Sequence, residues 1–292
     1  MEKVSSERLE SAYQTALAAL LAERHPDGYW TGELSTSALS TATAITALAL
    51  VQKCAGAPGR FDSLIDGGLA WLVEHQNDDG GWGDTTKSIS NISTSMLVRA
   101  ALAIADRPNN PQSAIRNPQS LSRLEAYLDQ HCGKSVPERA EAIRRRYGKD
   151  RTFAVPILTM CALAGLVPWT EVNALPFELA CFPQSWFRFL KLPVVSYALP
   201  ALIAIGQAIY QHRPPWNPVA RLVRSMARGR SLRVLEQIQP SNGGFLEATP
   251  LTSFVTMSLA SIGQADHPVA RKGAEFIVNS VRPDGSWPID TN

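Results

Sequence analysis

A polar turn of one plan occurs four times along the 292 residues of the chain. Each copy has Asp or Asn directly before a glycine, and an aromatic residue two positions after that glycine. The copies are RHPDGYW at 24–30, QNDDGGW at 76–82, QPSNGGF at 239–245 and VRPDGSW at 281–287. The glycine permits a turn with positive φ, and the preceding Asp or Asn can hydrogen-bond the turn backbone.

The segments around these turns have helical periodicity. Before the second turn, SLIDGGLAWLVEHQ places apolar residues at spacings of three and four. After the first two turns, STSALSTATAITALALV and SISNISTSMLVRAALAIA combine Ser and Thr caps with alanine-rich stretches suited to close helix packing. Repeated helical hairpins cannot bury their faces alone, so they must stack or close. The sequence therefore predicts an all-α fold, an α/α barrel with small-residue inner helices and amphipathic outer helices.

The neighbouring acids Asp78 and Asp79 raise the alternative of a catalytic acid pair. A catalytic pair need not recur, but here the turn recurs without it: Asn242 occupies the acid position in the third copy, and the other copies lack a second acid. Turn chemistry explains every copy. The repeat is thus interpreted as a structural staple whose residues are Gly28, Trp30, Gln76, Gly80, Trp82, Gln239, Gly243, Phe245, Gly285 and Trp287.

Composition narrows the class of protein. Charged residues make up 18% of the chain, where soluble proteins average about 25%. The net charge of +2 is too small to attract nucleic acid over the whole surface. The four cysteines form no CxxC pair, which is typical of free thiols in a reducing compartment. The apolar runs at 152–169 and 192–209 fall short of about 20 residues and contain proline. They are expected to form buried helices, or a segment that dips into one leaflet.

Several segments together resemble one family. GLAWLVEHQNDDGGW is similar to the QW motif of squalene-hopene and oxidosqualene cyclases, and KGAEFIVNSVRPDGSW is similar to another copy in which Val281 replaces the usual glutamine. AYQTALAALLAERHPDGYWTGEL, VPWTEVNALPFELACFP and NGGFLEATPLTSF resemble further family segments in the same order. The resemblance implies a class II terpene cyclase: a monotopic membrane protein of two α-barrels, one inserted near the start of the other.

The resemblance also implies a domain division and a reaction. Residues 1–35 would be the first helix and turn of the catalytic barrel, and residues 36–292 the inserted barrel, apparently truncated at its C-terminal end. The family's DxDD acid motif is absent, and the nearest string is PIDTN with the single Asp290. The expected function is that of the N-terminal portion of a squalene-hopene-type cyclase in hopanoid biosynthesis. The chain alone would be inactive, and the acid would lie outside it, in following sequence or a partner chain.

The implied site residues form two sets. By resemblance, the wall of the polyene pocket would include Trp169, Ala248, Pro250, Phe254 and Ile289, although Phe254 and Ile289 replace the family's usual tyrosine and tryptophan. All five could instead be core residues. In the segment 175–195, Phe182, Trp186, Phe189 and Leu190 can share a helical face beside basic residues, which favours contact with a membrane surface. Burial against another domain is the alternative.

Partners and location follow from the same resemblance. The expected partners are squalene or a related polyene, a membrane surface and the missing catalytic barrel, with a homo-oligomer possible and nucleic acid excluded. The location would be cytoplasmic and peripheral to the membrane. The final turn, with no helix after it, is expected to leave apolar surface exposed. The basic runs 221–233 and 144–146 are interpreted as solvated helix faces, with anionic headgroups as the second choice.

Two other functions remain open. A non-catalytic lipid-binding or scaffold domain could keep the barrel without the chemistry. Protein prenyltransferases share the barrel and bind zinc through Asp, Cys and His, but the five histidines here show no ligand spacing. No metal, no cofactor and no catalytic residue is therefore assigned.

Overall fold

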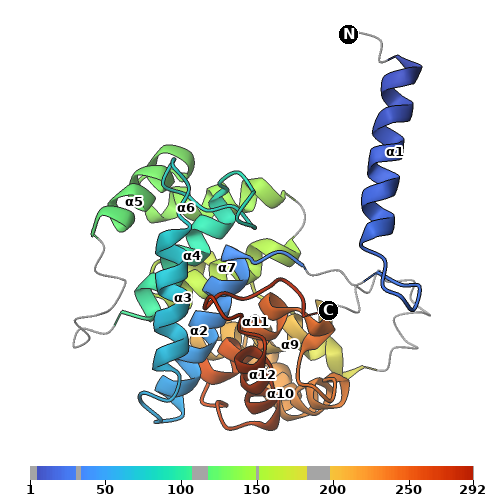
Figure 1. Ribbon diagram of the computed structural model, residues 1–292. Helices are drawn as coiled ribbons and strands as arrows, with labels where there is room; N and C mark the ends of the chain where they lie inside the picture. Colours follow the sequence, from blue (N-terminus) through green and yellow to red (C-terminus); the bar gives the residue numbers. More distant parts are fainter. Residues whose placement is uncertain (1–4, 31–33, 107–117, 149–150, 183–197, 292) are drawn as a thin grey trace. The chain divides into compact units, whose positions relative to one another are not determined.

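The computed structural model describes residues 5–30, 34–106, 118–148, 151–182 and 198–291. These residues divide into two compact units, one ending at Leu34 and one covering Ser35–Thr291. The described residues form eleven α-helices and short 3-10 turns, with isolated bridges but no strand (Figure 1). Each unit is described by itself.

The first unit is one helix followed by one Gly-aromatic turn. Helix α1 (Ser6–Ala22) begins at the N-cap Ser5, whose side chain accepts a hydrogen bond from the Arg8 amide. Trp30 of the turn reaches back to the helix, where its indole Nε1 donates to the Leu20 carbonyl at 2.6 Å. No residue of α1 is buried.

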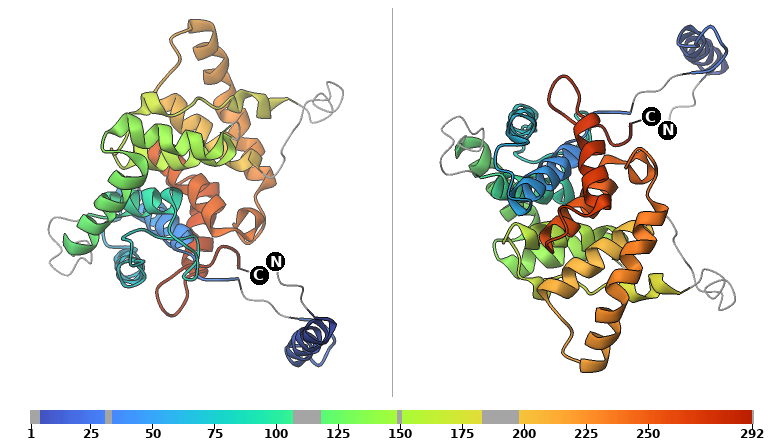
Figure 2. Two further views of the ribbon diagram at one scale, coloured as in Figure 1. Left: turned by 90° about the horizontal axis from the view of Figure 1, so that it is seen from above. Right: turned by 90° about the horizontal axis from the view of Figure 1, so that it is seen from below.

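The second unit has an inner ring of five helices. They are α2 (Ala38–Cys54), α4 (Ile92–Ile104), α7 (Arg151–Leu163), α9 (Leu199–His212) and α11 (Thr249–Ser261). In this order each packs on the next, and α11 packs on α2, so the ring is closed (Figure 2). Within the described residues, the apolar runs noted in the sequence form part of α7 and α9, both largely buried.

Five outer helices cover this ring. They are α3 (Asp62–Glu74), α5 (Pro118–Cys132), α6 (Val136–Tyr147), α10 (Pro218–Ile238) and α12 (Pro268–Asn279). Helix α3 packs on α2, α5 on α4, α6 on α7, α10 on α9 and α12 on α11. The predicted all-α fold with an α/α barrel is confirmed.

Small side chains explain which helices lie inside. Helix α2 reads ALSTATAITALALVQKC, and all but three of its residues are buried. Its threonines can be buried because their hydroxyls donate to carbonyls one turn earlier, as Thr41 does to Ser37 at 2.8 Å and Thr46 to Ala42 at 2.9 Å. A helix of this composition lets neighbouring backbones approach closely on every side.

An ion-pair cluster joins the outer helices α5 and α6 to the inner helix α4. The Glu125 carboxylate accepts hydrogen bonds from Arg99 at 2.5 Å and from Arg139 at 2.8 Å, and Arg139 also contacts Asp129 at 2.7 Å. Burial alone would raise the pKa of Glu125, but the two guanidinium groups more than offset it, so the pKa lies below its ordinary value.

This cluster should make stability depend on acid pH. The lowered pKa of folded Glu125 contributes stability above the unfolded value, near 4.3 for glutamate, and that contribution is lost as pH falls through the folded pKa. We expect Glu125→Gln to lower the free energy of unfolding by about 1–2 kcal/mol at pH 7, and by much less at pH 3. Urea titrations at both pH values test this. Glu74→Gln, at an exposed position of α3, is the control. Equal losses at pH 7 and pH 3 would contradict the prediction.

No helix among the described residues is long and apolar enough to cross a bilayer.

Candidate functional site at the turn end of the barrel

The Gly-aromatic turns of the second unit lie at one end of the barrel, before the N-termini of the inner helices. We call this the turn end and define it by residues 76–91, 239–250 and 281–291. Short connections at 55–61 and 262–267 join inner and outer helices at the opposite end. The turn end holds the repeated motif and most of the predicted pocket residues.

Each turn tryptophan closes the end of the helix that precedes it. The indole Nε1 donates to a carbonyl ten residues earlier: Trp30 to Leu20, Trp82 to Leu72 and Trp287 to Ile277, at 2.6, 2.8 and 2.7 Å. The last carbonyls of a helix have no partner inside it, so the ring supplies one while covering the helix end. Trp82 and Trp287 are fully buried in doing so.

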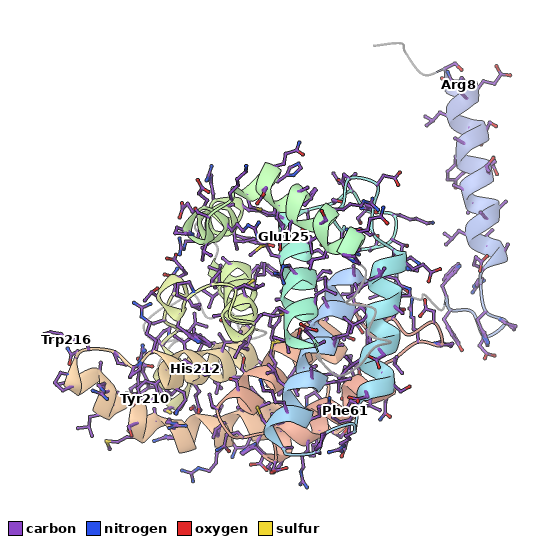
Figure 3. The ribbon with its side chains drawn as sticks, turned by 90° about the vertical axis from the view of Figure 1, so that its left-hand side faces the viewer. Arg8, Phe61, Glu125, Tyr210, His212 and Trp216 are labelled. Carbon is purple, nitrogen blue, oxygen red and sulfur yellow. The ribbon has the colours of Figure 1, made fainter. Side chains whose placement is uncertain are left out.

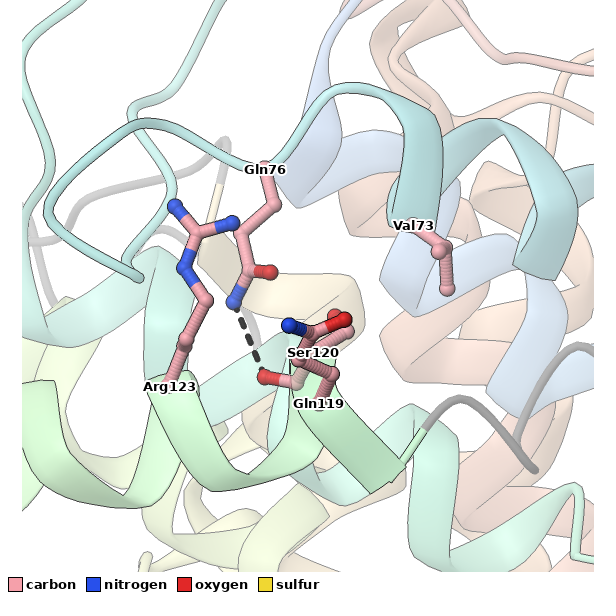
Figure 4. Close-up of a pocket in the computed structure, with 5 residues that line it drawn as sticks. All are labelled: Val73, Gln76, Gln119, Ser120 and Arg123. Atoms are coloured by element: carbon pink, nitrogen blue, oxygen red, sulfur yellow. Dashed lines mark hydrogen bonds between the residues drawn. The ribbon is translucent and has the colours of Figure 1, made fainter.

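The glutamines tie each turn to the next outer helix. Gln76 Nε2 donates to the Gly80 carbonyl at 2.8 Å and to the Ser120 carbonyl of α5 at 3.0 Å (Figure 4). Gln239 repeats this arrangement, donating to Gly243 at 3.0 Å and to Val269 of α12 at 3.1 Å. The glutamine is therefore a bridge between consecutive outer helices.

A small pocket of about 200 Å³ lies beside this bridge. It is lined by Val73 of α3, by Gln76 of the turn that follows α3, and by Gln119, Ser120 and Arg123 of α5 (Figure 4). Arg123 donates to the carbonyls of Asn77 and Asp78, at 2.7 and 3.0 Å. The pocket is thus a gap between α3 and α5. Its one cationic group, the guanidinium of Arg123, is already hydrogen-bonded to turn carbonyls.

The Asp and Asn side chains of the turns accept hydrogen bonds from the turn backbone. Asp79 Oδ1 accepts from the Gly81 amide at 3.0 Å, Asn242 Oδ1 from Gly244 at 3.1 Å and Asp284 Oδ1 from Ser286 at 3.0 Å. Because Asn242 makes the same bond as the aspartates, the bond needs an oxygen and no charge.

The pKa of Asp284 is also unlike that of an acid that stays protonated at neutral pH. Burial alone would raise the pKa of Asp284, but hydrogen bonds from Ser286 and from the Trp71 side chain more than offset this and hold the pKa below its usual range. An acid that keeps its proton near neutral pH needs the opposite shift.

The last turn closes the ring, which bears on one expectation. Trp287 donates its amide to Thr41 Oγ1 of α2 at 3.0 Å, just as Trp82 donates to Ser95 Oγ of α4 at 3.0 Å. Trp287 of this turn is 0% exposed, whereas Ile289, two residues further on, is 36% exposed, so the expected exposed apolar surface is found at Ile289 and not at the tryptophan. The closed ring brings α2, the first helix of the unit, to the place of a following helix.

Three of the predicted pocket residues meet at the turn end. The Thr249 amide, between Ala248 and Pro250, donates to the Ile289 carbonyl at 3.0 Å, and Ala248 forms a bridge with Asp290. Ile289 is 36% exposed, whereas Phe254 lies one turn further along α11 and belongs to the core. Ala248, Pro250 and Ile289 thus form one partly exposed apolar edge, with Phe254 behind it.

Trp169 lies at the opposite end of the barrel. It begins the 3-10 turn η2 (Trp169–Glu171) and stacks on His212, the last residue of α9, with ring centroids 4.4 Å apart and planes at 5°. Backbone hydrogen bonding links His212 to Ser261, the last residue of α11. Since α11 is 13 residues long, about 20 Å separate this end from Ala248. The structure does not bring Trp169 together with the other four residues.

The turn end also contains a strained pair that the sequence did not reveal. Leu246 and Glu247, in the 3-10 turn η5 (Phe245–Glu247), have positive φ angles of 53° and 56°. Side chains with a Cβ rarely adopt this region, so surrounding contacts must hold it. One such contact is the hydrogen bond from the Thr291 amide to the Glu247 carbonyl at 3.3 Å. No residue pattern signals this, because leucine and glutamate are not typical of left-handed turns.

Two further predictions concern other parts of the chain. Phe182, after the 3-10 turn η3 (Phe177–Cys181), is exposed, while Trp186, Phe189 and Leu190 lie outside the described residues. Within the described ranges, no group of three or more His, Cys, Asp or Glu side chains converges as a metal site would.

Comparison with known families gives one match. Residues 13–115 match the family described as the squalene-hopene cyclase N-terminal domain. This range runs from α1 through the first two turns to α4 and beyond. The match covers about a third of the chain and agrees with the resemblance seen in the sequence over that part. The edge formed by Ala248, Pro250 and Ile289 lies outside the matched range.

Proposed function

We propose that this chain acts as the N-terminal portion of a squalene-hopene-type cyclase, which converts squalene or a related polyene to a polycyclic triterpene. The observation that carries the proposal is the family match over residues 13–115. The closed α/α barrel with its stapled turns supports it, because both belong to the architecture that the resemblance implied. The cyclase would act at the cytoplasmic membrane, from which it would take its substrate.

The groups that the reaction needs would come partly from this chain and partly from another segment. Protonating an isolated alkene requires a carboxylic acid held protonated in a dry, low-dielectric site. The resulting cation then needs apolar walls that exclude water and aromatic faces that stabilise charge. We propose that the acid lies in a DxDD segment outside residues 1–292. This chain would supply part of the apolar wall of the substrate pocket.

The edge at the turn end is the proposed wall. Ala248, Pro250 and Ile289 offer apolar surface there, and the buried Phe254 supports it from within the barrel. Backbone bonds from both α11 and the last turn fix this edge, so it presents a shaped surface to a substrate. Trp169, at the other end, is left out of the proposed wall and packs on His212 instead.

We expect cyclised product only when both portions are present. The purified chain is incubated with squalene in detergent, alone and with a fragment that bears a DxDD motif, and extracted products are identified by mass spectrometry. The chain alone should give no product above a boiled control, because it lacks the acid. The mixture should give cyclised triterpene, and changing the DxDD aspartates to asparagine should abolish it.

A matched pair of variants tests the wall. Ile289→Glu should lower product formation by the mixture at least about tenfold, because a carboxylate brings water into the apolar wall and its oxygen captures the cation. Val136→Glu, at an exposed position at the start of α6 and outside the turn end, should leave the rate unchanged. Product from the chain alone would refute the proposed division and point to Asp78, Asp79 or Asp290. Squalene binding without product in any mixture would favour the lipid-binding scaffold.

A further inference from the structure

The apolar edge at the turn end is held by two short segments that pair with each other. The Thr249 amide donates to the Ile289 carbonyl at 3.0 Å, and the Thr291 amide donates to the Glu247 carbonyl at 3.3 Å. These two hydrogen bonds lie on either side of an antiparallel bridge. We call the paired segments the edge clamp; they are residues 247–249 and 289–291.

A very short connection gives the edge clamp its left-handed backbone. The amides of Phe245 and Trp82 each donate to a hydroxyl in the first turn of the inner helix that follows them. Nine residues separate Trp82 from that helix, but only three separate Phe245 from it. The chain after Phe245 must therefore reverse at once, and it does so through the positive φ angles of Leu246 and Glu247.

This turn determines where the Glu247 carbonyl points. Helix α11 begins its hydrogen-bond ladder at the Ala248 carbonyl, which accepts from the Thr252 amide at 3.1 Å. The Glu247 carbonyl lies before the ladder, where it accepts from the amide and the hydroxyl of Thr291, at 3.3 and 3.4 Å. The Glu247 carboxylate instead accepts from the Asn242 side chain at 3.4 Å. The strained backbone thus presents an acceptor to the last turn.

The two segments of the clamp differ in how firmly they are held. Helix α11 carries the first segment and packs on α2, α9 and α12 along its length, as far as the end of the barrel marked by His212 in Figure 3. The second segment leaves the core after the buried Trp287. Ile289 is 36% exposed and Thr291 is exposed, so side-chain packing contributes little to holding them. Their position therefore depends on the hydrogen bonds of the clamp.

We propose that the left-handed backbone of Leu246 and Glu247 is a positioning device for the substrate wall. Its carbonyl at Glu247 binds Thr291 and thereby fixes Ile289 in the wall. The proposal rests on the wall assigned under the proposed function. A wall in a fixed position keeps water from the carbocation until its rings are complete. When the clamp opens, water adds to the cation through its oxygen and releases a proton, which gives an alcohol with fewer rings.

The variant Thr291→Pro opens the clamp at an exposed position. Proline lacks the amide hydrogen that bonds Glu247, and the extended backbone of a bridge before it suits proline. In residue-resolved hydrogen exchange of the chain alone, the Thr249 amide should exchange at least about tenfold faster. The Thr252 amide, inside α11, should keep its protection, and the midpoint of thermal unfolding should shift by less than about 3 °C.

Two matched variants leave the clamp in place. Thr291→Ser keeps the amide and the hydroxyl, and Glu247→Gly keeps the carbonyl while removing the cost of a side chain at positive φ. In both, the Thr249 amide should exchange as it does in the native chain. Equal exchange at Thr249 in the native chain and in Thr291→Pro would overturn the proposal.

The products of the cyclisation mixture give a second readout. With squalene and the DxDD-bearing fragment, Thr291→Pro should raise the share of incompletely cyclised alcohols at least about threefold. Squalene consumption should change less than about twofold, and Thr291→Ser should restore the native pattern. Lost stability alone would lower the total without changing the pattern.

The two proposals fail in different ways. An active native mixture with an unchanged product pattern in Thr291→Pro would overturn the positioning role alone. A native mixture that gives no product would refute the proposed function and, with it, the positioning role.

Discussion

Replacing Trp287 with alanine should lower the free energy of unfolding by about 3–5 kcal/mol, the range for removing a large aromatic side chain from a core. The ring is fully buried, and Ile45 of α2 lies close beside it at Gly68 of α3. The substitution removes this packing and leaves the Ile277 carbonyl without its indole partner. It thus weakens the junction at which the last turn meets the first helices of the barrel.

Urea titration followed by circular dichroism measures this loss. Trp216→Ala is the matched control, because it deletes the same side chain at a position that is 99% exposed. The control should change the free energy of unfolding by no more than about 0.5 kcal/mol. A loss below about 1 kcal/mol in Trp287→Ala would mean that the ring stays closed without this side chain.

The second large effect is expected from Gly243→Ala. Gly243 has φ of +87°, and a Cβ placed on it would lie 2.3 Å from the carbonyl oxygen and 2.8 Å from the carbonyl carbon of Lys272 in α12. Both atoms belong to the helix backbone, which cannot move aside as a side chain could. We expect a loss of at least about 3 kcal/mol, since a contact this short adds to the strain of the left-handed conformation.

The variant Gly263→Ala separates the strain of a positive φ from the short contact with α12. Gly263 also has a positive φ, +76°, but a Cβ there would meet nothing within 4 Å. This control should lose only about 1 kcal/mol, the cost of placing alanine in a left-handed conformation. Chemical denaturation of both variants gives the comparison. Equal losses would show that backbone strain, and not the approach of α12, makes glycine necessary in this turn.

Local features of the fold could be read from the sequence. The bonds from Gln76 to Gly80 and from Trp82 to Leu72 join groups no more than ten residues apart, and helical spacing and small residues distinguish inner from outer helices. Ring closure could not be read in this way. The bond between Trp287 and Thr41 spans 246 residues, and no local pattern specifies which helix the last turn meets.

The candidate site was predictable in part. Ala248, Pro250 and Ile289 were grouped by the family resemblance alone, and the structure places them side by side. Trp169 shows the limit of that reasoning, because a large aromatic ring packs well at either end of a barrel, and here it stacks on His212.

The closing bond between Trp287 and Thr41 has a consequence for synthesis on the ribosome. Helix α2 leaves the exit tunnel early, but the turn that covers its first residues is made 246 residues later. At about 5–20 residues per second, that interval lasts roughly 12–50 s. During it, a helix that has all but three of its residues buried in the finished barrel lacks its final neighbours. The nascent chain should therefore be a client for chaperones that shield apolar helices until the last turn emerges.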